Sequence, residues 1–391
     1  MRGKDIRQGN EKLVLRLIQR EGLLSQSEAV ELTGLKAPTI LRIFTNLEEE
    51  GLILISDKAK DTGAGERKGR KPVYYRLNPD ALYVVGLEFW AASATVVISN
   101  FVREPVYSET IEIEREIGGE AVTAKLIELI EGSIRRNKIS RRRIAGIGIG
   151  APGKVDIAEG TVLYYSRIPG LKDFALREYL EKSFDLPIFI HNNCSVIAMN
   201  EYSSGGTDQA ENIMAVLIRG GVGGAYINNG KIITSGNITT MEIGHMSVMP
   251  GGRECSCGEA GCLETYLSED SILSDLSFDG FSSIKELDDA ISDGRLSAGA
   301  EAVFDEKAGI LSAALRTLGH LFSPNLFLII SRGESLSRLL AEKAEAGLSG
   351  GSGCGENRKS RLKPACYDPL HAGMGACDIV FSNFFNGLID R

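Results

Sequence analysis

The sequence predicts an α/β protein with an N-terminal winged helix-turn-helix and a larger, two-lobed α/β body. Residues 1–78 contain three short helical patterns followed by two strand patterns, which is the element order of a winged helix. From Tyr83 onward, strand and helix patterns alternate over about 300 residues, which favours two lobes with a cleft between them. The chain of 391 residues is long enough for two or three domains with separate cores. We expect domains at 1–78, 79–190 and 191–367, with a C-terminal helix near 368–391 completing the first lobe.

The elements of the N-terminal domain are predicted from helical spacing and from residues that begin and end helices. The apolar residues of 8–21 have helical spacing. Ser25 or Ser27 can cap a second helix, which ends at Gly34. A third helix begins near Pro38, because proline is tolerated in the first turn of a helix. The stretches LILIS and VYYRL then predict the two strands of a hairpin.

The third helix has one apolar face and one polar face. Its apolar positions, at i, i+3, i+4 and i+7, are Ile40, Ile43, Phe44 and Leu47. The opposite face carries Lys36, Thr39, Arg42 and Asn46. These side chains can reach phosphates or base edges, so we predict DNA binding. The alternative is a helical dimerisation module whose basic side chains are simply solvated.

A second basic feature, ERKGRKP at residues 66–72, lies between the two strands. Its cationic side chains are Arg67, Lys68, Arg70 and Lys71. A stretch of this kind can insert arginine into a narrow minor groove, although a solvated surface loop is the alternative. Residues 1–78 hold 15 Lys and Arg against 11 Asp and Glu, a net +4, and the remaining chain is net −12. A basic head on an acidic body indicates that only the head meets a polyanion.

The composition argues against an exported or membrane-spanning protein. The start, MRGKDIRQGN, lacks the apolar segment of a signal peptide, and no run of about 18 apolar residues occurs. The seven cysteines are an odd number, which favours cytosolic thiols and metal ligands over a disulfide framework. We expect a cytoplasmic protein without membrane contact.

The body contains predicted buried strands, amphipathic helices and glycine turns. The strands are YVVGLEFW, ATVVIS, IAGIGIGAPG and LPIFIHNN, the helices AVTAKLIELIEGSIRRN and LREYLEKSF, and the hairpin MAVLIRGGVGGAYINNGKIIT. The turn RGGVGGA, residues 219–225, can bring bare backbone N–H groups to a phosphate, but a tight hairpin explains it equally well. GLSGGSGCGENRKSRLKP, residues 347–364, predicts a flexible surface loop.

One histidine and three cysteines lie close together in the loop 245–262. They are His245, Cys255, Cys257 and Cys262. Four N and S ligands match a closed tetrahedral zinc site, which leaves no position open for water or substrate. We therefore predict one structural zinc ion per chain. The alternative is a group of free buried cysteines beside an unrelated histidine.

The run EIGHMSV…CSCGEAGCLE resembles the signature of the ROK family, which comprises sugar kinases and sugar-responsive transcriptional repressors. The resemblance covers about residues 80–265, through GIGIGAPGKVD, IPGLKDFALREYLEKSFDLPIFIHNN and RGGVGGAYINNGKI, and continues loosely to HAGMGAC at 371–377. The head is similar to that of the repressor branch, which joins a winged helix to the body through a basic Gly-Arg linker. The resemblance implies an actin-like, ribonuclease-H-like body with two lobes.

In that family the metal is structural and the residues around it bind a sugar. The resemblance therefore implies that Glu242, His245 and Glu264 contact sugar hydroxyls. His245 would bind zinc through one ring nitrogen and face the sugar with the other. Further positions that match sugar contacts or lie near the sugar are Asn192, Asn193, Gly153 and Ser166.

The chain departs from the kinase branch at four places. A kinase of this family uses an aspartate after the asparagine as its general base, and this chain has Asn193, a carboxamide without usable basicity. The first phosphate loop reads GLEFWAAS, where Trp90 would fill space that a phosphate needs. The second loop reads RGGVGGA without the threonine of the family pattern, and the C-terminal glycine stretch reads IISRGES. We assign no catalytic residue.

These observations predict a transcriptional repressor whose DNA binding responds to a sugar or sugar derivative between the lobes. We expect a palindromic operator and a homodimer or homotetramer. One alternative is a sugar kinase with an appended DNA-binding head, which requires ATP turnover. Another is a protein-interaction platform in which a partner, and no sugar, relieves repression.

Overall fold

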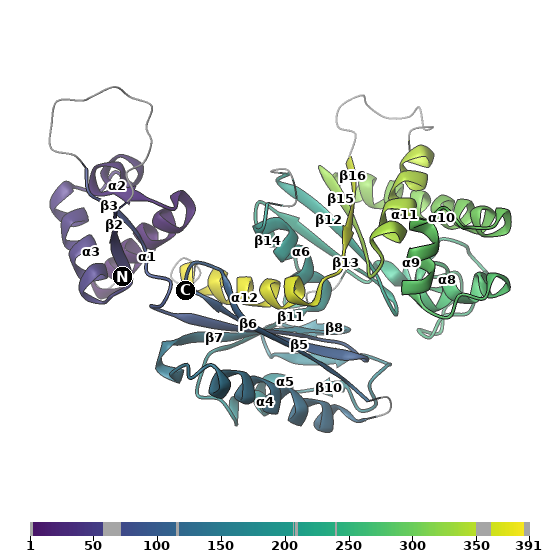
Figure 1. Cartoon of the computed structure of the whole chain (residues 1–391), viewed down its shortest axis with the longest axis horizontal. Coiled ribbons are helices and arrows are strands. Elements are labelled where there is room, and N and C mark those ends of the chain that lie inside the picture. The colour runs from purple at the N-terminus through teal and green to yellow at the C-terminus, as the bar shows by residue number, and fades with distance from the viewer. Residues whose placement is uncertain are drawn as a thin grey trace.

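The computed structural model describes residues 3–57, 72–114, 117–205, 207, 210–238, 241–348 and 361–386. A winged helix at the N-terminal end is followed by two five-stranded sheets with their covering helices (Figure 1). This arrangement confirms the predicted fold class. None of the described helices is long and apolar enough to cross a membrane.

The winged helix contains three helices and a small sheet. The helices are α1 (Gly3–Glu21), α2 (Gln26–Thr33) and α3 (Ala37–Glu49), and the sheet has the order β1 (Leu24–Ser25), β3 (Tyr74–Leu77), β2 (Ile53–Ser56). Helix α1 begins before the predicted start at residue 8. Ser25 caps α2, because its Oγ accepts the N–H of Glu28 while the Glu28 carboxylate accepts the N–H of Ser25. Gly34, with φ 68°, ends α2 in the left-handed conformation, so both predicted ends are confirmed.

Helix α3 buries one face and exposes the other, as its sequence predicts. Its buried residues are Ile40, Ile43, Phe44 and Leu47. Lys36 and Arg42 are exposed and Thr39 is half-buried, whereas the Asn46 amide donates to the Glu11 carboxylate of α1. The basic residues Arg67, Lys68, Arg70 and Lys71 lie outside the described residues, as does most of the predicted loop 347–364.

The first lobe is built on a mixed sheet in the order β11-β7-β4-β5-β6. Its strands are β4 (Tyr83–Phe89), β5 (Ser93–Asn100), β6 (Pro105–Glu112), β7 (Ile144–Ala151) and β11 (Ile188–Asn192). Strands β4, β7 and β11 are parallel, so their carboxyl ends meet at one edge. Because side chains alternate along a strand, Val85, Leu87 and Phe89 pack against α4 (Gly119–Arg136) and α5 (Leu176–Glu181). The opposite face is covered by α12 (Pro369–Asn386) (Figure 1).

Three short strands and a single-turn helix complete the first lobe. Strands β8 (Lys154–Asp156), β9 (Thr161–Tyr164) and β10 (Lys172–Phe174) form a small antiparallel sheet in the order β10-β9-β8. The single-turn helix is η1 (Arg141–Arg143). Strand β8 follows shortly after β7, so the small sheet begins close to the edge where the parallel strands end.

The second lobe has a sheet in the order β14-β13-β12-β15-β16. Its strands are β12 (Asn212–Ile218), β13 (Val222–Asn228), β14 (Lys231–Ile232), β15 (Leu326–Ser331) and β16 (Arg361–Cys366). One face packs against α6 (Asn193–Ser203) and α12, and the other against the remaining helices. Those helices are α7 (Glu264–Leu267), α8 (Glu269–Asp275), α9 (Ile284–Ser292), α10 (Ala298–Phe322) and α11 (Glu334–Leu348), with the single turns η2 (Ile243–His245) and η3 (Ser277–Asp279).

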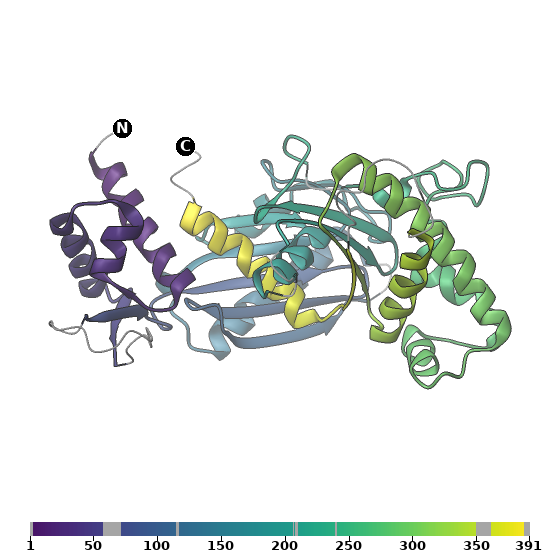
Figure 2. The same cartoon turned by 90° about the horizontal axis from the view of Figure 1, so that it is seen from above.

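Helices α6 and α12 lie together between the two sheets, and α12 continues toward the winged helix (Figures 1 and 2). Apolar residues of α12 belong to two hydrophobic clusters. Ala372, Ala376 and Ile379 pack with residues of the second sheet, and Phe381 and Phe385 pack with α1 residues. One helix therefore contacts both lobes and the winged helix.

Candidate functional site

A cavity of about 520 Å³ lies between the two lobes. The first lobe lines it with residues that follow the carboxyl ends of its parallel strands: Trp90 after β4, Gly153 after β7 and Asn193 after β11. The second lobe contributes the β12–β13 turn, the segment around η2 and the start of α7. Ligands of α/β proteins typically bind at this edge of a parallel sheet.

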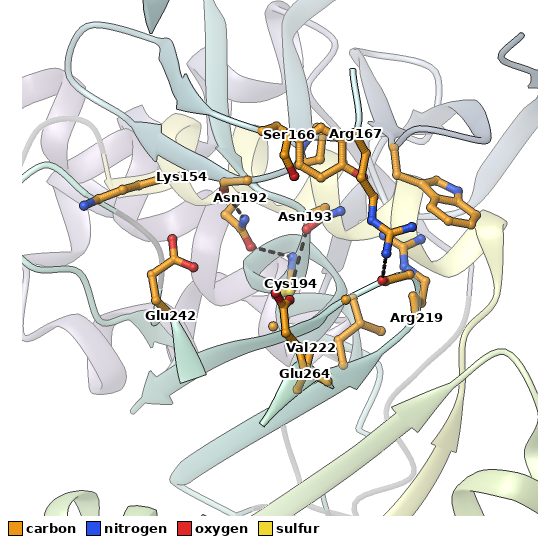
Figure 3. A pocket seen from close by; sticks show the side chains of 18 of the residues that line it. Lys154, Ser166, Arg167, Asn192, Asn193, Cys194, Arg219, Val222, Glu242 and Glu264 are labelled. Carbon is orange, nitrogen blue, oxygen red and sulfur yellow. Dashed lines mark hydrogen bonds between the residues drawn. The ribbon is translucent and has the colours of Figure 1, made fainter. Parts of the chain in front are cut away.

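All seven residues predicted to lie at or near a sugar line this one cavity. They are Gly153, Ser166, Asn192, Asn193, Glu242, His245 and Glu264. Figure 3 shows Ser166, Asn192 and Asn193 on one side, with Glu242 and Glu264 across from them. Residues separated in sequence by about a hundred positions therefore meet in the fold, which the sequence patterns alone do not establish.

The two asparagines are buried at the start of α6. Asn192 caps this helix, because its side-chain oxygen accepts the N–H of Cys194 at 2.7 Å. Its Nδ2 donates to the carbonyl of Gly153 at 2.6 Å. Gly153 has φ 74°, and a Cβ there would collide with the carbonyl oxygen of Tyr164, so glycine is needed in this turn. Asn192 is therefore held rigidly, and Asn193 follows it as the first residue of α6.

The four predicted metal ligands converge in one cluster. One donor atom from each of His245, Cys255, Cys257 and Cys262 lies within 4.8 Å of the others. The Sγ atoms of Cys257 and Cys262 are 3.7 Å apart, and Cys255 Sγ is 3.5 Å from His245 Nδ1. Two thiolates bound tetrahedrally at a Zn–S distance of about 2.3 Å stand roughly 3.8 Å apart. The donor set and its spacing therefore fit a tetrahedral metal ion.

The metal loop is fixed to the helices behind it by Arg253. Its guanidinium binds the Asp275 carboxylate through two hydrogen bonds of 2.9 and 3.0 Å and stacks on the Tyr266 ring. The buried Lys307 of α10 donates to the same carboxylate and to the Tyr266 carbonyl. These groups hold the loop against α7, whose first residue is Glu264.

His245 connects the metal cluster to the cavity. Its Nδ1 lies toward Cys255 and is 3.6 Å from the Glu264 carboxylate, whereas its Nε2 is 4.0 Å from Glu242. Burial raises the pKa of Glu242, against the lowering effects of His245 and Lys154. One ring nitrogen thus faces the cysteines while the other faces an acidic part of the cavity.

The opposite end of the cavity is formed by residues that were not predicted as site residues. Arg219 is 4% exposed, and its guanidinium lies over the rings of Trp90, at 4.9 Å, and Tyr367, at 4.5 Å. Its Nη2 donates to Glu88 at 2.9 Å, and the Tyr367 hydroxyl donates to the other oxygen of the same carboxylate. Arg332, paired with Glu269, lies over the Trp90 ring as well. Aromatic and cationic side chains therefore pack together at the end of the cavity where the GLEFWAAS and RGGVGGA loops lie.

Sequence patterns offered only weak signals for this end. Arg219 was visible as the residue before the glycines of RGGVGGA, and Trp90 as a bulky residue in a loop expected to be small. Lys154 and Arg167 also line the cavity, and Arg167 donates to the Gly220 carbonyl and to Asp270. Neither has a motif that would single it out.

Comparison with known proteins finds family matches in two separate parts of the chain. Residues 90–338 match the model of the ROK family, and residues 7–53 match that of a winged helix-turn-helix DNA-binding domain. The chain therefore belongs to the ROK family, and it carries an N-terminal winged helix-turn-helix.

Its relatives include repressors and kinases. The xylose repressor of Caldicellulosiruptor bescii is 26% identical over 353 residues, 86% of each chain. The N-acetylglucosamine repressor of Escherichia coli O157:H7 is 27% identical over 68% of this chain and 64% of its own. A glucokinase of Halalkalibacterium halodurans is 31% identical over 49% of this chain and 58% of its own.

Solved structures show the fold. A ROK family transcriptional regulator, a homologue of the E. coli MLC protein, superposes with a TM-score of 0.80 over 98% of both chains, at 23% identity. A ROK glucokinase from Streptomyces griseus, solved with glucose and AMPPNP, superposes with a TM-score of 0.64 over 76% of this chain and 98% of its own, at 21% identity. The body therefore has the kinase-type, actin-like fold that the resemblance implied. The glucokinase covers 76% of this chain and the regulator 98%, so the regulator structure extends further over this chain.

Proposed function

We propose that this protein is a transcriptional repressor whose binding to an operator changes when a sugar or sugar derivative occupies the cavity between the lobes. The observation that carries the proposal is the combination of a winged helix, with Lys36 and Arg42 exposed on α3, and a cavity lined by all seven predicted sugar residues. The relatives named as a xylose repressor and an N-acetylglucosamine repressor support it.

On the DNA side, α3 enters the major groove with its exposed face. Three residues on the exposed side of α3, Lys36, Thr39 and Arg42, contact phosphates or base edges. The basic stretch 66–72 adds contacts in the adjacent minor groove. A homodimer would present two such helices to a palindromic operator, and the protein would act in the cytoplasm where that DNA is.

On the sugar side, carboxylates and amides bind the hydroxyls. Glu242 and Glu264 accept hydrogen bonds from hydroxyl groups, whereas Asn193 can both donate and accept. We propose that the metal ion bound by the cysteine cluster is zinc, because one imidazole and three thiolates form a donor set that zinc prefers. Zinc with four protein ligands supplies no open coordination position, so its part is to hold His245 and the loop. His245 then presents a ring nitrogen of fixed orientation to the sugar.

A sugar screen tests the proposal directly. The single tryptophan of the chain, Trp90, lines the cavity, so its fluorescence should change when a ligand binds. We expect one sugar of a panel that includes D-xylose and N-acetylglucosamine to change this fluorescence, to raise the melting temperature, and to alter the affinity for a DNA duplex selected by the protein from a random library. A protein that selects no duplex, or whose DNA affinity no sugar of the panel alters, would contradict the proposal.

The kinase alternative is favoured by one observation, the 31% identity to a glucokinase. Against it, Asn193 replaces the base, and the Glu88–Arg219 pair with Trp90 fills the end of the cavity that the phosphate loops form. We propose that phosphoryl transfer is absent. The Asn193→Asp variant makes the test sharper, because restoring the carboxylate should not restore ATP turnover while the other end stays filled. ATP-dependent phosphorylation of any sugar by the native chain would overturn this view.

A further inference from the structure

We infer that helix α12 transmits sugar binding from the cavity to the winged helix, because it packs against α6 at the cavity and against α1 at its other end. The inference rests on the proposed function and adds to it the route of regulation. It concerns contacts within one chain and requires no change at an interface between copies.

The first step of the route is the start of α6. Asn192, Asn193 and Cys194 line the cavity, and the Asn192 side chain closes the first turn of the helix. Residues 193–200 of α6 are all buried. A sugar that binds Asn193 or shifts Asn192 therefore acts on the end of a packed helix. A displacement of α6 is then passed on to the elements that pack against it, because close-packed interiors transmit displacement.

The second step is an unusually close crossing of α6 and α12. A Cβ on Gly375 would collide with the backbone carbonyl of Val196, so the two helices touch through their main chains at this point. Arg103, which lies between β5 and β6, bridges the same two helices on one side. Arg103 binds both oxygens of Asp378, at 2.6 and 2.7 Å, and its Nη2 also donates to Asn200 of α6 at 3.1 Å. Because Asp378 is 6% exposed, breaking this arrangement is costly, and α6 and α12 shift together.

The third step is the contact between α12 and α1. Val14, Leu17 and Ile18 of α1 belong to the same hydrophobic cluster as Phe381 and Phe385 of α12. The ammonium of Lys12 lies 5.1 Å from the centre of the Phe384 ring. Figures 1 and 2 both show this end of α12 beside the winged helix. A shift of α12 therefore changes the seating of α1, and with it the direction in which α3 faces DNA.

The test measures how strongly sugar and DNA binding are coupled in the full-length, metal-loaded protein. Sugar affinity is obtained from Trp90 fluorescence with D-xylose and with N-acetylglucosamine, and DNA affinity with the selected duplex. The ratio of DNA dissociation constants with and without sugar is the coupling factor, expected to be roughly 5–150 in the native chain. Hydrogen exchange of the α1 amides gives a second readout that does not need DNA.

Two variants interrupt the route at different steps. Gly375→Ala forces α6 and α12 apart, and Phe384→Ala removes the ring under Lys12 while Phe385 still holds the cluster together. Both should bring the coupling factor to about 1, with sugar affinity retained and with no sugar-dependent change in α1 exchange. Phe278→Ala is the matched control, because this ring is 60% exposed in the second lobe, and it should keep the native coupling.

The outcomes separate the inference from the function on which it rests. A Phe384→Ala protein that binds sugar and keeps the native coupling factor overturns the inference, even if Gly375→Ala fails to fold. Equal loss of coupling in the Phe278→Ala control overturns it too, since the effect would then have no relation to the route. A native chain whose DNA affinity does not respond to sugar refutes the proposed function itself.

Discussion

The Glu88 carboxylate lies 2.9 Å from Nη2 of Arg219, although the two residues are 131 positions apart in the sequence. Glu88 lies at the end of strand β4 of the first lobe, and Arg219 follows strand β12 of the second. Both side chains are almost fully buried, at 1% and 5% exposure. This ion pair joins the two lobes at the end of the cavity that Trp90 and Arg219 line.

The pair gives a prediction about stability. Replacing Glu88 with methionine leaves the Arg219 charge buried without its partner, which should lower the free energy of unfolding by about 3–5 kcal/mol. Replacing both residues with methionine removes the unpaired charge and should recover most of that loss. Urea denaturation of the three proteins measures the effect. A double variant as unstable as the single one would mean that the loss comes from packing and not from charge.

Removal of the metal gives a second prediction. A strong chelator should release one metal ion per chain and lower the free energy of unfolding. If the free metal concentration was roughly 1,000 times the Kd before the chelator was added, the loss should be about 4 kcal/mol. Sugar affinity should fall with it, because His245 and Glu264 lose their fixed positions. Elemental analysis and calorimetry measure both changes. Cys257→Ser should behave like the chelated protein. Cys366→Ser is the control, because it changes an exposed cysteine outside the cluster, and it should keep its metal. A native protein that is fully stable without metal would contradict the assignment.

The exposed face of α3 gives a prediction about DNA binding. Lys36→Ala and Arg42→Ala should each weaken binding to the selected duplex, and each should reduce the slope of log K against log salt by about 0.9 for every phosphate that the side chain no longer neutralises. Both residues are exposed, so the melting temperature should stay the same. Lys285→Ala, at an exposed position of α9 in the second lobe, is the control. Equal weakening by the control would show that only net charge matters.

His191 gives a prediction about pH. Its Nδ1 is buried without a hydrogen-bond partner among the described residues, and burial, with the Arg177 charge, lowers the pKa of His191 from 6.5 to about 4. Between pH 6.5 and 4 the unfolded chain therefore binds a proton that the folded chain does not, so the free energy of unfolding falls as the pH falls through this window. The slope approaches about 1.4 kcal/mol per pH unit in mid-window.

Substitution isolates this contribution from the other titrating groups. His191→Gln should lose less stability than the native chain between pH 7 and pH 5, as measured by urea denaturation at each pH. The same change at His320, which is exposed on α10, should leave the native pH dependence in place. If His191→Gln follows the native curve, the histidine takes up its proton in the folded state and the prediction is wrong.

Local features of the fold were predictable because they depend on short-range chemistry. Ser25 and Glu28 form a capping box, and the spacing of Ile40, Ile43, Phe44 and Leu47 creates a helix face that must be buried. The ends of these elements follow from hydrogen bonds within three or four residues. The start of α1 was predicted too late, because its first turn carries no apolar periodicity.

The candidate metal ligands and the candidate sugar residues were predicted on different grounds. His245, Cys255, Cys257 and Cys262 lie within one short loop, so their donor atoms can meet whatever the rest of the chain does. The sugar residues were inferred from family resemblance, and their roles, like the domain limits of 1–78, 79–190 with 368–391, and 191–367, stay predictions. Their common position around one cavity depends on two sheets packing against α6 and α12.

The winged helix, the α/β body and the cluster of one histidine and three cysteines could be predicted from the sequence, because each of these depends on neighbours in the chain. The pairing of Arg219 with Glu88 at one end of the cavity, and the approach of the α12 main chain at Gly375 to Val196, depend on the tertiary structure. Such contacts join segments more than a hundred residues apart, and no local preference of either segment specifies its partner. They depend on how the two sheets close over the helices between them, and that closure is what connects the cavity to α1.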